Sequence, residues 1–511
     1  MRMREQRSEG VIGNITGIIC TIVSVVVMIY ICRFACGDDI WYDEVFSLGF
    51  IRGNIRELIS LTAGDVHPPL YYIYLKAVCG IATGLWGEEI LIPAAKAASI
   101  IPWCGVLVLA LTVIRKRYGM TVAGFFMLLV TVMPQLGTYY LEIRMYSFAL
   151  LLITAAILTG IGIVCDDKKP GIVHFVMLVM LGIMTAYTQY YACIAIIGLY
   201  IAMFVLILTG KDEEKRYKLK GITVCAVASS VLYLPWIPTL LKQMGNINGN
   251  YWIQPLTLRS IPGCIKFIVL PVSGAGVLGY VAAALVLITM GIVTILFLRK
   301  KDKCGKIMVI LSIASLLFTV VSGFVLSLAG TPIFIYRYMI PALGGLYLAF
   351  AVMADRVAEG KWIPVILCPF LITGFLSIMG LRDEEGKKIV QMQHAEEVLR
   401  SIPEGSDIIT NFDHVTAVMG YYRPDLNIHL YDAETDRLIR QMFVNVDDEL
   451  GDDQVAELVR NESPVFFMGS FNSRDDIVAD WEKIGIGSEL KDSMLIERYW
   501  INLYELRPVV Y

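Results

Sequence analysis

Carboxylates, arginines and a histidine recur in short polar stretches that separate long apolar runs of the sequence. Side chains of these types exchange protons and hold phosphate groups, which are the two requirements of many transfer reactions. An ionisable side chain close to a membrane is costly, so it usually has a function. The candidate residues are Asp43, Glu44, Asp65, His67, Glu142, Arg144, Arg337 and Tyr338.

This set fits the transfer of a group away from a phosphate. A carboxylate, Asp43 or Glu44, would take the proton of the acceptor during its attack. Planar guanidinium groups match phosphate oxygens, so Arg144 and Arg337, together with His67, would hold the departing phosphate. Each feature alone also has a plainer explanation: a solvated loop for the acids, a turn for the histidine, and an interfacial ion pair for a glutamate beside an arginine.

The composition predicts the elements that must position these residues. Hydrophobic residues make up 57% of the 511 residues and charged residues 17%, against about 25% in soluble domains. A soluble protein of this composition could not keep its surface hydrated, so we expect an integral membrane protein.

The charge distribution predicts two domains. Residues 381–511 hold 13 Lys and Arg against 27 Asp and Glu, whereas residues 1–380 hold 30 against 19. We therefore expect a transmembrane domain over residues 1–380 and a soluble extracytoplasmic domain over residues 381–511.

The basic residues between the apolar runs predict an orientation in the membrane. The links that contain Arg115–Arg117 and Arg299–Lys306 are basic and fall on the side of the N-terminus, which predicts a cytoplasmic N-terminus and an acidic tail outside the cell. Residues 69–84 are apolar but short and begin at a proline pair, so they are predicted to form a juxtamembrane or re-entrant helix in the first outer loop. Eleven apolar runs are long enough to cross: 11–33, 90–114, 120–137, 144–164, 171–189, 191–210, 219–241, 275–298, 306–329, 338–355 and 361–380.

The acidic tail has the pattern of a small α/β domain. Strands are predicted over 407–410, 427–431, 464–468 and 495–506, and helices over 414–422 and 474–483. The predicted fold class is thus an α-helical integral membrane protein with about 11 transmembrane helices and juxtamembrane helices in the first outer loop, followed by this α/β extracytoplasmic domain.

Five strings, in order within residues 10–350, resemble motifs of the C-type polytopic membrane glycosyltransferases, in the group that includes protein O-mannosyltransferases and lipid A aminoarabinose transferases. They are Trp41–Ser47, His67–Tyr72, Glu142–Ser147, Tyr233–Pro238 and Arg337–Pro341. The resemblance implies an inverting glycosyltransferase that moves a sugar from an undecaprenyl- or dolichyl-phosphate donor at the outer face of the cell membrane.

The resemblance also implies roles for the candidates. Asp43 is expected to be the catalytic base, with Glu44 as its neighbour or as a sugar contact. His67 is expected to lie against the lipid phosphate, and both arginines are expected to contact the phosphate or the sugar. The expected substrate-binding set is His67, Asp65, Glu142, Arg144, Arg337 and Tyr338.

The expected partners are a polyprenyl-phosphate sugar donor, membrane lipids and an acceptor that the sequence does not identify: a protein, a lipid or a wall polymer. No nucleic acid and no cofactor are expected. Metal dependence stays open: acids such as Asp38 and Asp39 could bind a divalent cation, but no ligand spacing argues for one. The alternatives are a transporter or flippase of lipid-linked sugars, and a non-catalytic family member that acts as a scaffold. A transporter would carry charges near the membrane midplane, whereas the central runs here are nearly free of charge.

Overall fold

The computed structural model describes residues 11–37, 40–166, 169–211, 213–246, 253–272, 276–359, 361–447, 450–461 and 463–509. Of the residues considered above, Asp38 and Asp39 lie outside this part of the chain. The chain forms two compact units, each made of two segments. The helical unit is Met1–Cys36 with Val66–Arg382, and the sheet unit is Gly37–Asp65 with Asp383–Tyr511.

The helical unit consists of long apolar helices and the short helices that link them. Its elements are α1 (Val11–Cys32), η1 (Arg33–Cys36), α4 (Leu70–Trp86), η2 (Glu88–Ile90), α5 (Leu91–Leu109), η3 (Ala110–Ile114), α6 (Arg115–Tyr118), α7 (Met120–Val132), α8 (Leu136–Leu141), α9 (Tyr146–Cys165), α10 (Ile172–Ala186), α11 (Tyr190–Thr209), α12 (Lys215–Tyr233), η4 (Leu234–Trp236), α13 (Ile237–Asn246), α14 (Ser260–Val269), α15 (Gly276–Leu298), α16 (Lys303–Ala329), η5 (Tyr336–Met339), α17 (Ile340–Ala358) and the first part of α18 (Ile363–Arg400).

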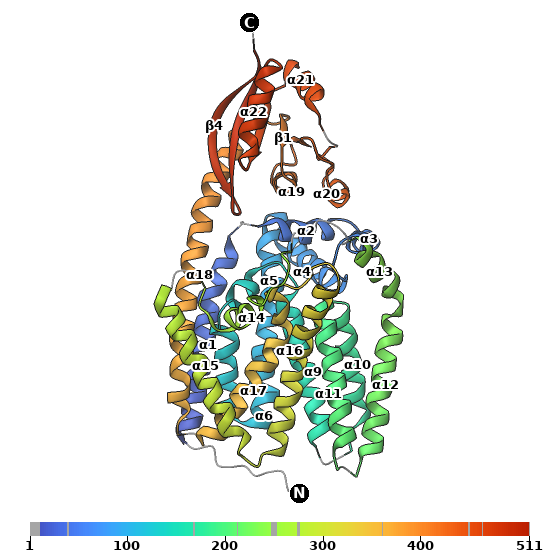
Figure 1. The fold of residues 1–511 in the computed structure, drawn as a ribbon, viewed down its shortest axis with the longest axis vertical. Helices are drawn as coiled ribbons and strands as arrows, with labels where there is room; N and C mark the ends of the chain where they lie inside the picture. Colours follow the sequence, from blue (N-terminus) through green and yellow to red (C-terminus); the bar gives the residue numbers. More distant parts are fainter. Residues whose placement is uncertain are drawn as a thin grey trace. The chain divides into compact units, whose positions relative to one another are not determined.

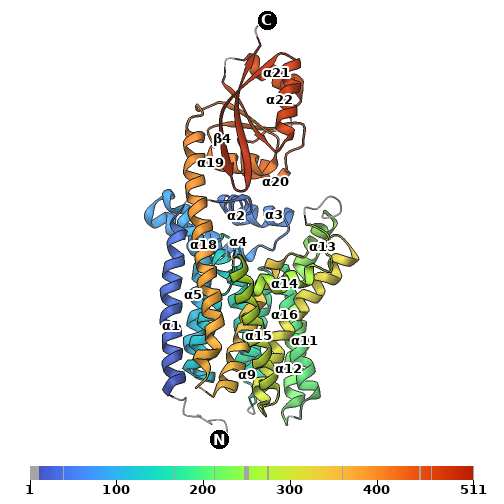
Figure 2. The same cartoon turned by 60° about the vertical axis from the view of Figure 1, so that its left-hand side comes forward.

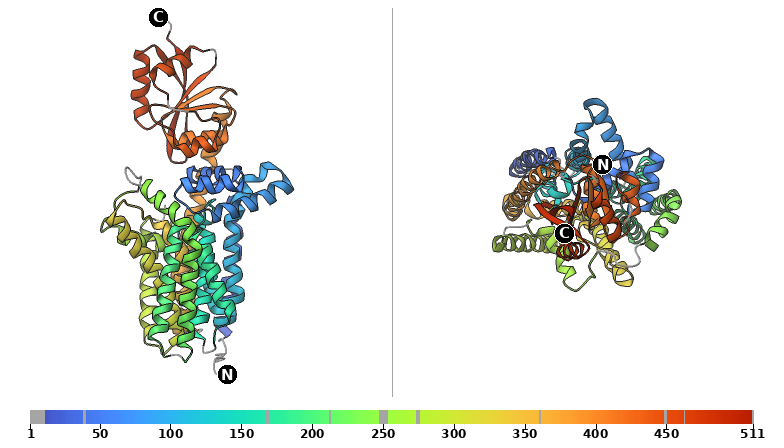
Figure 3. Two further views of the ribbon diagram at one scale, coloured as in Figure 1. Left: turned by 90° about the vertical axis from the view of Figure 1, so that its right-hand side faces the viewer. Right: turned by 90° about the horizontal axis from the view of Figure 1, so that it is seen from above.

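The spans agree with those expected from the apolar runs. Within the described residues, nine helical stretches are long and apolar enough to cross a membrane. The shorter apolar helices α7 and α10 coincide with two further predicted spans, and Figure 3 shows α11 and α12, drawn in green, running side by side. The fold class predicted from the sequence, that of a multi-pass membrane protein with a small C-terminal α/β domain, is confirmed.

Helices α9 and α17 form the centre of the helical unit. They are the most buried of the long helices, whereas α12 is the least buried, and Figure 1 shows α9, α10 and α11 next to one another. Helices α1 and α7 approach closely because Gly17 and Gly124 face each other: a Cβ on Gly124 would lie 2.0 Å from the Gly17 carbonyl oxygen. Small residues at such contacts are the usual means of close helix packing in membranes.

The basic links gather at one end of the helical unit. Arg117, at the end of α6, forms an ion pair with Asp166 at 2.8 Å and lies 3.9 Å from the sulfur of Cys304 at the start of α16. Lys218 of α12 donates to the Asp166 carbonyl at 2.9 Å. These residues lie in or next to four different links, so the links that were predicted to share one side of the membrane meet at one end of the helical unit. Which side of the membrane this end faces stays a prediction.

The sheet unit combines the first outer loop with the C-terminal tail. Its elements are α2 (Tyr42–Arg52), α3 (Ile55–Gly64), the last part of α18, β1 (Asp407–Thr410), α19 (Asp413–Tyr422), β2 (Asn427–Leu430), α20 (Arg437–Met442), α21 (Asp452–Arg460), β3 (Val465–Ser470), α22 (Ser473–Lys483), β4 (Ile486–Ile496) and β5 (Tyr499–Pro508).

The five strands form one mixed sheet in the order β2-β1-β3-β5-β4. Strands β2, β1 and β3 are parallel, and β5 and β4 are antiparallel additions at one edge. Ile409 of β1 packs with Phe467 and with Trp481 of α22, whereas the adjacent Thr410 lies 2.6 Å from Thr416 of α19. Since neighbouring residues of a strand face opposite sides, α21 and α22 cover one face, as Figure 2 shows, and α19 the other.

Candidate active site

Several segments bring polar side chains to the end of the helical unit opposite the basic links. His67 precedes the proline pair from which α4 starts, and Arg144 lies in the turn between α8 and α9. Proline suits a helix start because the first turn leaves N–H groups without helical partners. The loop between α10 and α11 lies beside this helix start, because the Leu70 N–H donates to the Tyr187 carbonyl at 3.0 Å.

His67 and Arg144 form a buried pair at the centre of this end. Nη2 of Arg144 lies 2.8 Å from Nε2 of His67, and Nη1 donates to the Tyr72 hydroxyl at 3.4 Å. The two residues are 7% and 4% exposed. A guanidinium donates hydrogen bonds and accepts none, so Nε2 is the acceptor and the imidazole proton resides on Nδ1.

The charge state of His67 follows from the same surroundings. Burial lowers the pKa of His67 well below its ordinary value, and the positive charges of Arg144 and Arg337 lower it further. His67 is therefore neutral, and its Nδ1–H has no partner among the described residues. A neutral donor next to guanidinium groups suits an anionic ligand with several oxygens, such as a phosphate.

A network of hydroxyl groups holds the backbone of Arg144. The Ser99 hydroxyl donates to the Arg144 carbonyl at 3.5 Å and lies 3.0 Å from the Tyr71 hydroxyl. Ser147 donates to the Ser99 carbonyl at 2.5 Å, and the Arg144 N–H donates to the Glu142 carbonyl at 2.7 Å. Helices α4, α5 and α9 thus share one buried network, which places the guanidinium before any ligand arrives.

Arg337 and Tyr338 come from η5, at the start of α17. The positive charge of Arg337 lies near enough to His67 to help lower the pKa of its imidazole. Tyr338 stacks on Tyr191, with ring centroids 4.5 Å apart and planes 16° apart. This stack connects η5 to the first turn of α11, so the segments that carry His67, Arg144 and Arg337 meet at one end of the helical unit.

Two buried polar residues at this end are absent from the set predicted by the sequence. Gln189 is 1% exposed, and neither atom of its side-chain amide has a hydrogen-bond partner among the described residues. Lys96 is 4% exposed and lies on α5 one turn before Ser99. A single lysine inside an apolar run is rare and usually functional, so this signal would have indicated Lys96 as a site residue. Nothing in the sequence indicates that a glutamine is buried.

The predicted base lies in the sheet unit. Asp43 is in the first turn of α2 and is half-buried. Glu44 is buried, and its Oε2 accepts from the Trp41 N–H at 3.1 Å, so it caps the start of α2. Asp65 caps the C-terminal end of α3. These three acids belong to the sheet unit and the remaining candidates to the helical unit, so their joint action on one substrate stays a prediction.

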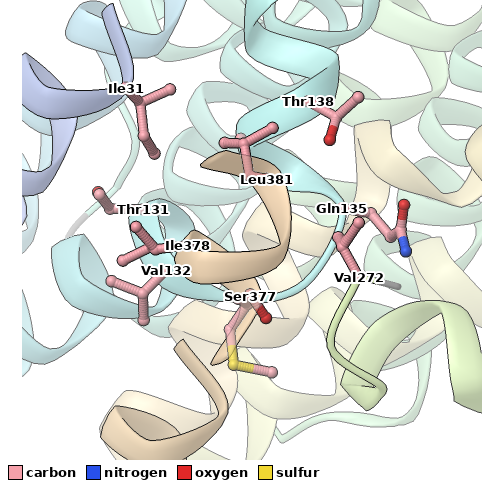
Figure 4. A pocket seen from close by; sticks show the side chains of 11 residues that line it. Ile31, Thr131, Val132, Gln135, Thr138, Val272, Ser377, Ile378 and Leu381 are labelled. Carbon is pink, nitrogen blue, oxygen red and sulfur yellow. The ribbon is translucent and has the colours of Figure 1, made fainter. Parts of the chain in front are cut away.

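Two cavities of the helical unit have linings that do not include His67. One, shown in Figure 4 between Ile31, Gln135 and Leu381, has a volume of about 10 Å³, which is room for one water molecule. A larger one of about 450 Å³ lies between Thr209, at the end of α11, and Lys303 of α16, at the end of the basic links. Among the described residues, no group of three or more His, Cys, Asp or Glu side chains could hold a metal ion.

Two solved structures of ArnT from Cupriavidus metallidurans are similar to this chain. The structure in the apo state has a TM-score of 0.60 at 12% identity, and the structure bound to undecaprenyl phosphate has a TM-score of 0.58 at 12% identity. Each comparison covers 96% of this chain and 97% of ArnT. The chain has the ArnT fold.

The resemblance to the aminoarabinose transferase group, suggested by five short strings, is confirmed at the level of this fold. The oligosaccharyltransferase AglB from Archaeoglobus fulgidus, in complex with an inhibitory peptide and a dolichol-phosphate, gives a TM-score of 0.43 at 9% identity over 79% of this chain and 63% of its own. No protein-family model matches the sequence, and no curated protein matches it.

Proposed function

We propose that this protein is an inverting glycosyltransferase that moves a sugar from a polyprenyl-phosphate donor to an acceptor at the outer face of the membrane. The observation that carries the proposal is the buried His67–Arg144 pair, with the charge of Arg337 acting on it. The neutral His67 offers an Nδ1–H that has no partner among the described residues, and such a donor beside a guanidinium group suits the oxygens of a phosphate. The ArnT structure that contains undecaprenyl phosphate supplies the matching class of ligand on the same fold.

The proposed reaction is a single displacement at the anomeric carbon. A hydroxyl or amine of the acceptor attacks this carbon, and the Asp43 carboxylate takes the proton that the attacking atom loses. The bond between the anomeric carbon and the phosphate oxygen breaks, and its electron pair stays on that oxygen. The products are the glycosylated acceptor and the polyprenyl phosphate.

The helical unit would stabilise the leaving group. Arg144 and Arg337 would neutralise the charge that develops on the phosphate, and the Nδ1–H of His67 would donate to one of its oxygens. Lys96 and Gln189 would be further contacts of the polar head of the donor. Glu44, which caps α2, would keep the chain around Asp43 in place.

The proposed sidedness follows from the same elements. The basic links meet at the opposite end of the helical unit from His67, and basic links stay in the cytoplasm. We therefore place the phosphate-binding end and the sheet unit outside the cytoplasm, with a cytoplasmic N-terminus. A polyprenyl carrier provides an activated sugar on that side, where nucleotide sugars are absent.

Transfer and transport are separated by one experiment on the purified protein in vesicles. The vesicles would contain a polyprenyl-phosphate sugar whose sugar is labelled and is mannose, glucose, galactose or aminoarabinose. Membranes of the cells that produce the protein would supply the acceptor. The proposal predicts free polyprenyl phosphate and a labelled acceptor for one of these donors. Labelled lipid that crosses the bilayer with its sugar still attached, and no release, would identify a flippase.

A further inference from the structure

The sheet unit has the edge at which α/β domains usually bind their ligands. Ligands of such sheets bind at the carboxyl ends of the parallel strands, where the strand order reverses. In this sheet that point lies between β1 and β3, because β2 and β3 pair with opposite sides of β1. The side-chain amide of Asn411 donates to the Ser470 carbonyl at 2.9 Å and accepts from the Ser470 N–H at 2.8 Å, so the loops after the two strands are joined.

The start of α2 covers this edge. Tyr42 stacks on His414, with ring centroids 3.8 Å apart and planes 2° apart. His414 in turn stacks on Phe412, which follows β1, at 4.6 Å. Phe471, which follows β3, and Tyr499 of β5 complete the aromatic cluster, each 4.9 Å from Phe412. A segment of the chain itself therefore occupies the place of a ligand.

Hydrogen bonds from the tail fix the backbone immediately before Asp43. The Tyr42 N–H donates to Oε1 of Glu497 at 2.5 Å, and the Ile40 N–H donates to the Tyr422 hydroxyl at 3.1 Å. The second carboxylate oxygen of Glu497 lies 3.7 Å from Nδ1 of His414. One glutamate thus contacts both the backbone of Tyr42 and the ring on which Tyr42 stacks.

Two residues of this edge have backbone angles that side chains rarely adopt. Glu497, in the turn between β4 and β5, has φ 57°, and Phe471 has φ 60°. Such conformations are unfavourable for residues other than glycine, and they concentrate at functional sites. Hairpin turns of two residues favour Asn and Gly at these angles. A glutamate at this position is understandable when its carboxylate is needed at the Tyr42 N–H.

The rest of α2 is also packed against the tail. A Cβ on Gly49 would lie 2.4 Å from the sulfur of Met442 in α20. The guanidinium of Arg52 lies over the rings of Tyr421 and Phe443, at 5.2 and 5.0 Å. A helix of 11 residues is marginal by itself in water, so these contacts hold the C-terminal part of α2 against the tail.

We propose that the sheet unit is a clamp that positions Asp43 for catalysis, with Glu497, His414 and Tyr422 as the positioning residues. The inference rests on the proposed function, because it takes Asp43 to be the base. In this arrangement the tail acts on the reaction through the first outer loop, which carries Asp43. Displacement of a reacting group by about 1 Å costs on the order of 100-fold in rate, so loosening the clamp would lower kcat.

Hydrogen exchange of the full-length protein tests the clamp without any substrate. Amides of residues 40–46 are expected to exchange slowly in the wild type and at least about 10-fold faster in Glu497→Ala. Glu489→Ala is the matched control, because Glu489 is on the same hairpin and pairs with Lys491 and Arg507. His414→Ala should accelerate exchange, whereas His414→Phe, which keeps a stacking ring, should not. Unchanged exchange in both Glu497→Ala and His414→Ala would refute the clamp.

Transfer kinetics of the same variants test the positioning role. Glu497→Ala and His414→Ala should lower kcat about 10- to 100-fold and leave the KM for the donor within about twofold, and His414→Phe should retain most of the rate. Faster exchange with an unchanged kcat would overturn the inference. A wild type that transfers no sugar from any polyprenyl phosphate would refute the proposed function, and the exchange data would then show by themselves whether the tail holds the loop.

Discussion

The side-chain amide of Gln189, which has no hydrogen-bond partner among the described residues, leads to a prediction in which a stabilising substitution impairs function. Gln189 and Gln243 are equally buried, at 1% and 2% exposure. The Gln243 amide oxygen accepts a hydrogen bond from the Tyr190 hydroxyl, whereas both amide atoms of Gln189 lack partners among the described residues. Leucine is close to glutamine in size, so Gln→Leu at each position isolates the effect of the amide.

The expected effects on stability have opposite signs. A buried polar group without a partner costs about 1 to 3 kcal/mol, so Gln189→Leu should raise the free energy of unfolding by an amount in this range. Gln243→Leu removes the partner of a tyrosine hydroxyl and should lower it by a similar amount. Equilibrium unfolding in mixed micelles with increasing SDS, without lipid ligand, measures both variants against the wild type.

The same amide should be needed when the donor binds. If the polar head of the donor supplies the missing partners, Gln189→Leu loses about 1 to 3 kcal/mol of binding, which corresponds to about 5- to 150-fold weaker affinity. Gln243→Leu should bind the donor as the wild type does. A Gln189→Leu protein that is less stable than the wild type, or that binds and transfers equally well, would refute the reasoning.

Three further predictions concern other elements of the helical unit. Arg144→Lys keeps the charge but loses the fork that contacts His67 and Tyr72, so we expect about 10- to 100-fold weaker binding of undecaprenyl phosphate by calorimetry; an affinity within twofold of the wild type would contradict this. The lowered pKa of His67 means that the unfolded chain binds more protons below about pH 6.5. The melting temperature should therefore fall as the pH drops from 6.5 to 5, and a dependence just as steep in His67→Gln would show that another group is responsible. Gly124→Ala would place a methyl group against the Gly17 carbonyl and should destabilise the protein by about 1 to 3 kcal/mol, whereas Gly291→Ala, on α15 with no atom near its Cβ position, should leave the melting temperature unchanged.

Much of the fold could be predicted because its signals are local. Apolar runs and the basic residues between them indicated the spans, and alternating or continuous apolar residues indicated β1, β2, β3 and β5. Strand β4 was missed because most of its residues are polar and exposed, as at the edge of a sheet. The short polar segments that became α20 and α21 carried no clear periodicity either.

The assignment of residues 37–65 to the sheet unit could not be predicted from local patterns. The hydrogen bonds from Ile40 to Tyr422 and from Tyr42 to Glu497 join residues 382 and 455 positions apart in the sequence. The change in the sign of the net charge near residue 381 indicates a domain boundary there. It does not indicate that residues 37–65, which come much earlier in the sequence, pack with the tail. The role suggested for the tail comes from the structure alone.

The candidate site was predicted in part. The types and spacing of His67 and Arg144 indicated a phosphate-binding role, and the structure places them 2.8 Å apart. The sequence suggested that His67 helps to hold the phosphate, and its burial beside Arg144 makes the imidazole neutral, so that it would do so as an N–H donor. Burial is a property of the folded chain, which is also why Gln189 was not among the predicted site residues.

The most direct test of the central claim compares binding and turnover in Asp43→Asn. Asparagine keeps the size of the side chain and cannot take a proton, so this variant should bind undecaprenyl phosphate with the affinity of the wild type. Its rate of sugar transfer should fall by about 10²- to 10⁴-fold. Wild-type turnover in a folded Asp43→Asn protein would contradict the account, because the acceptor would then lose its proton to another group.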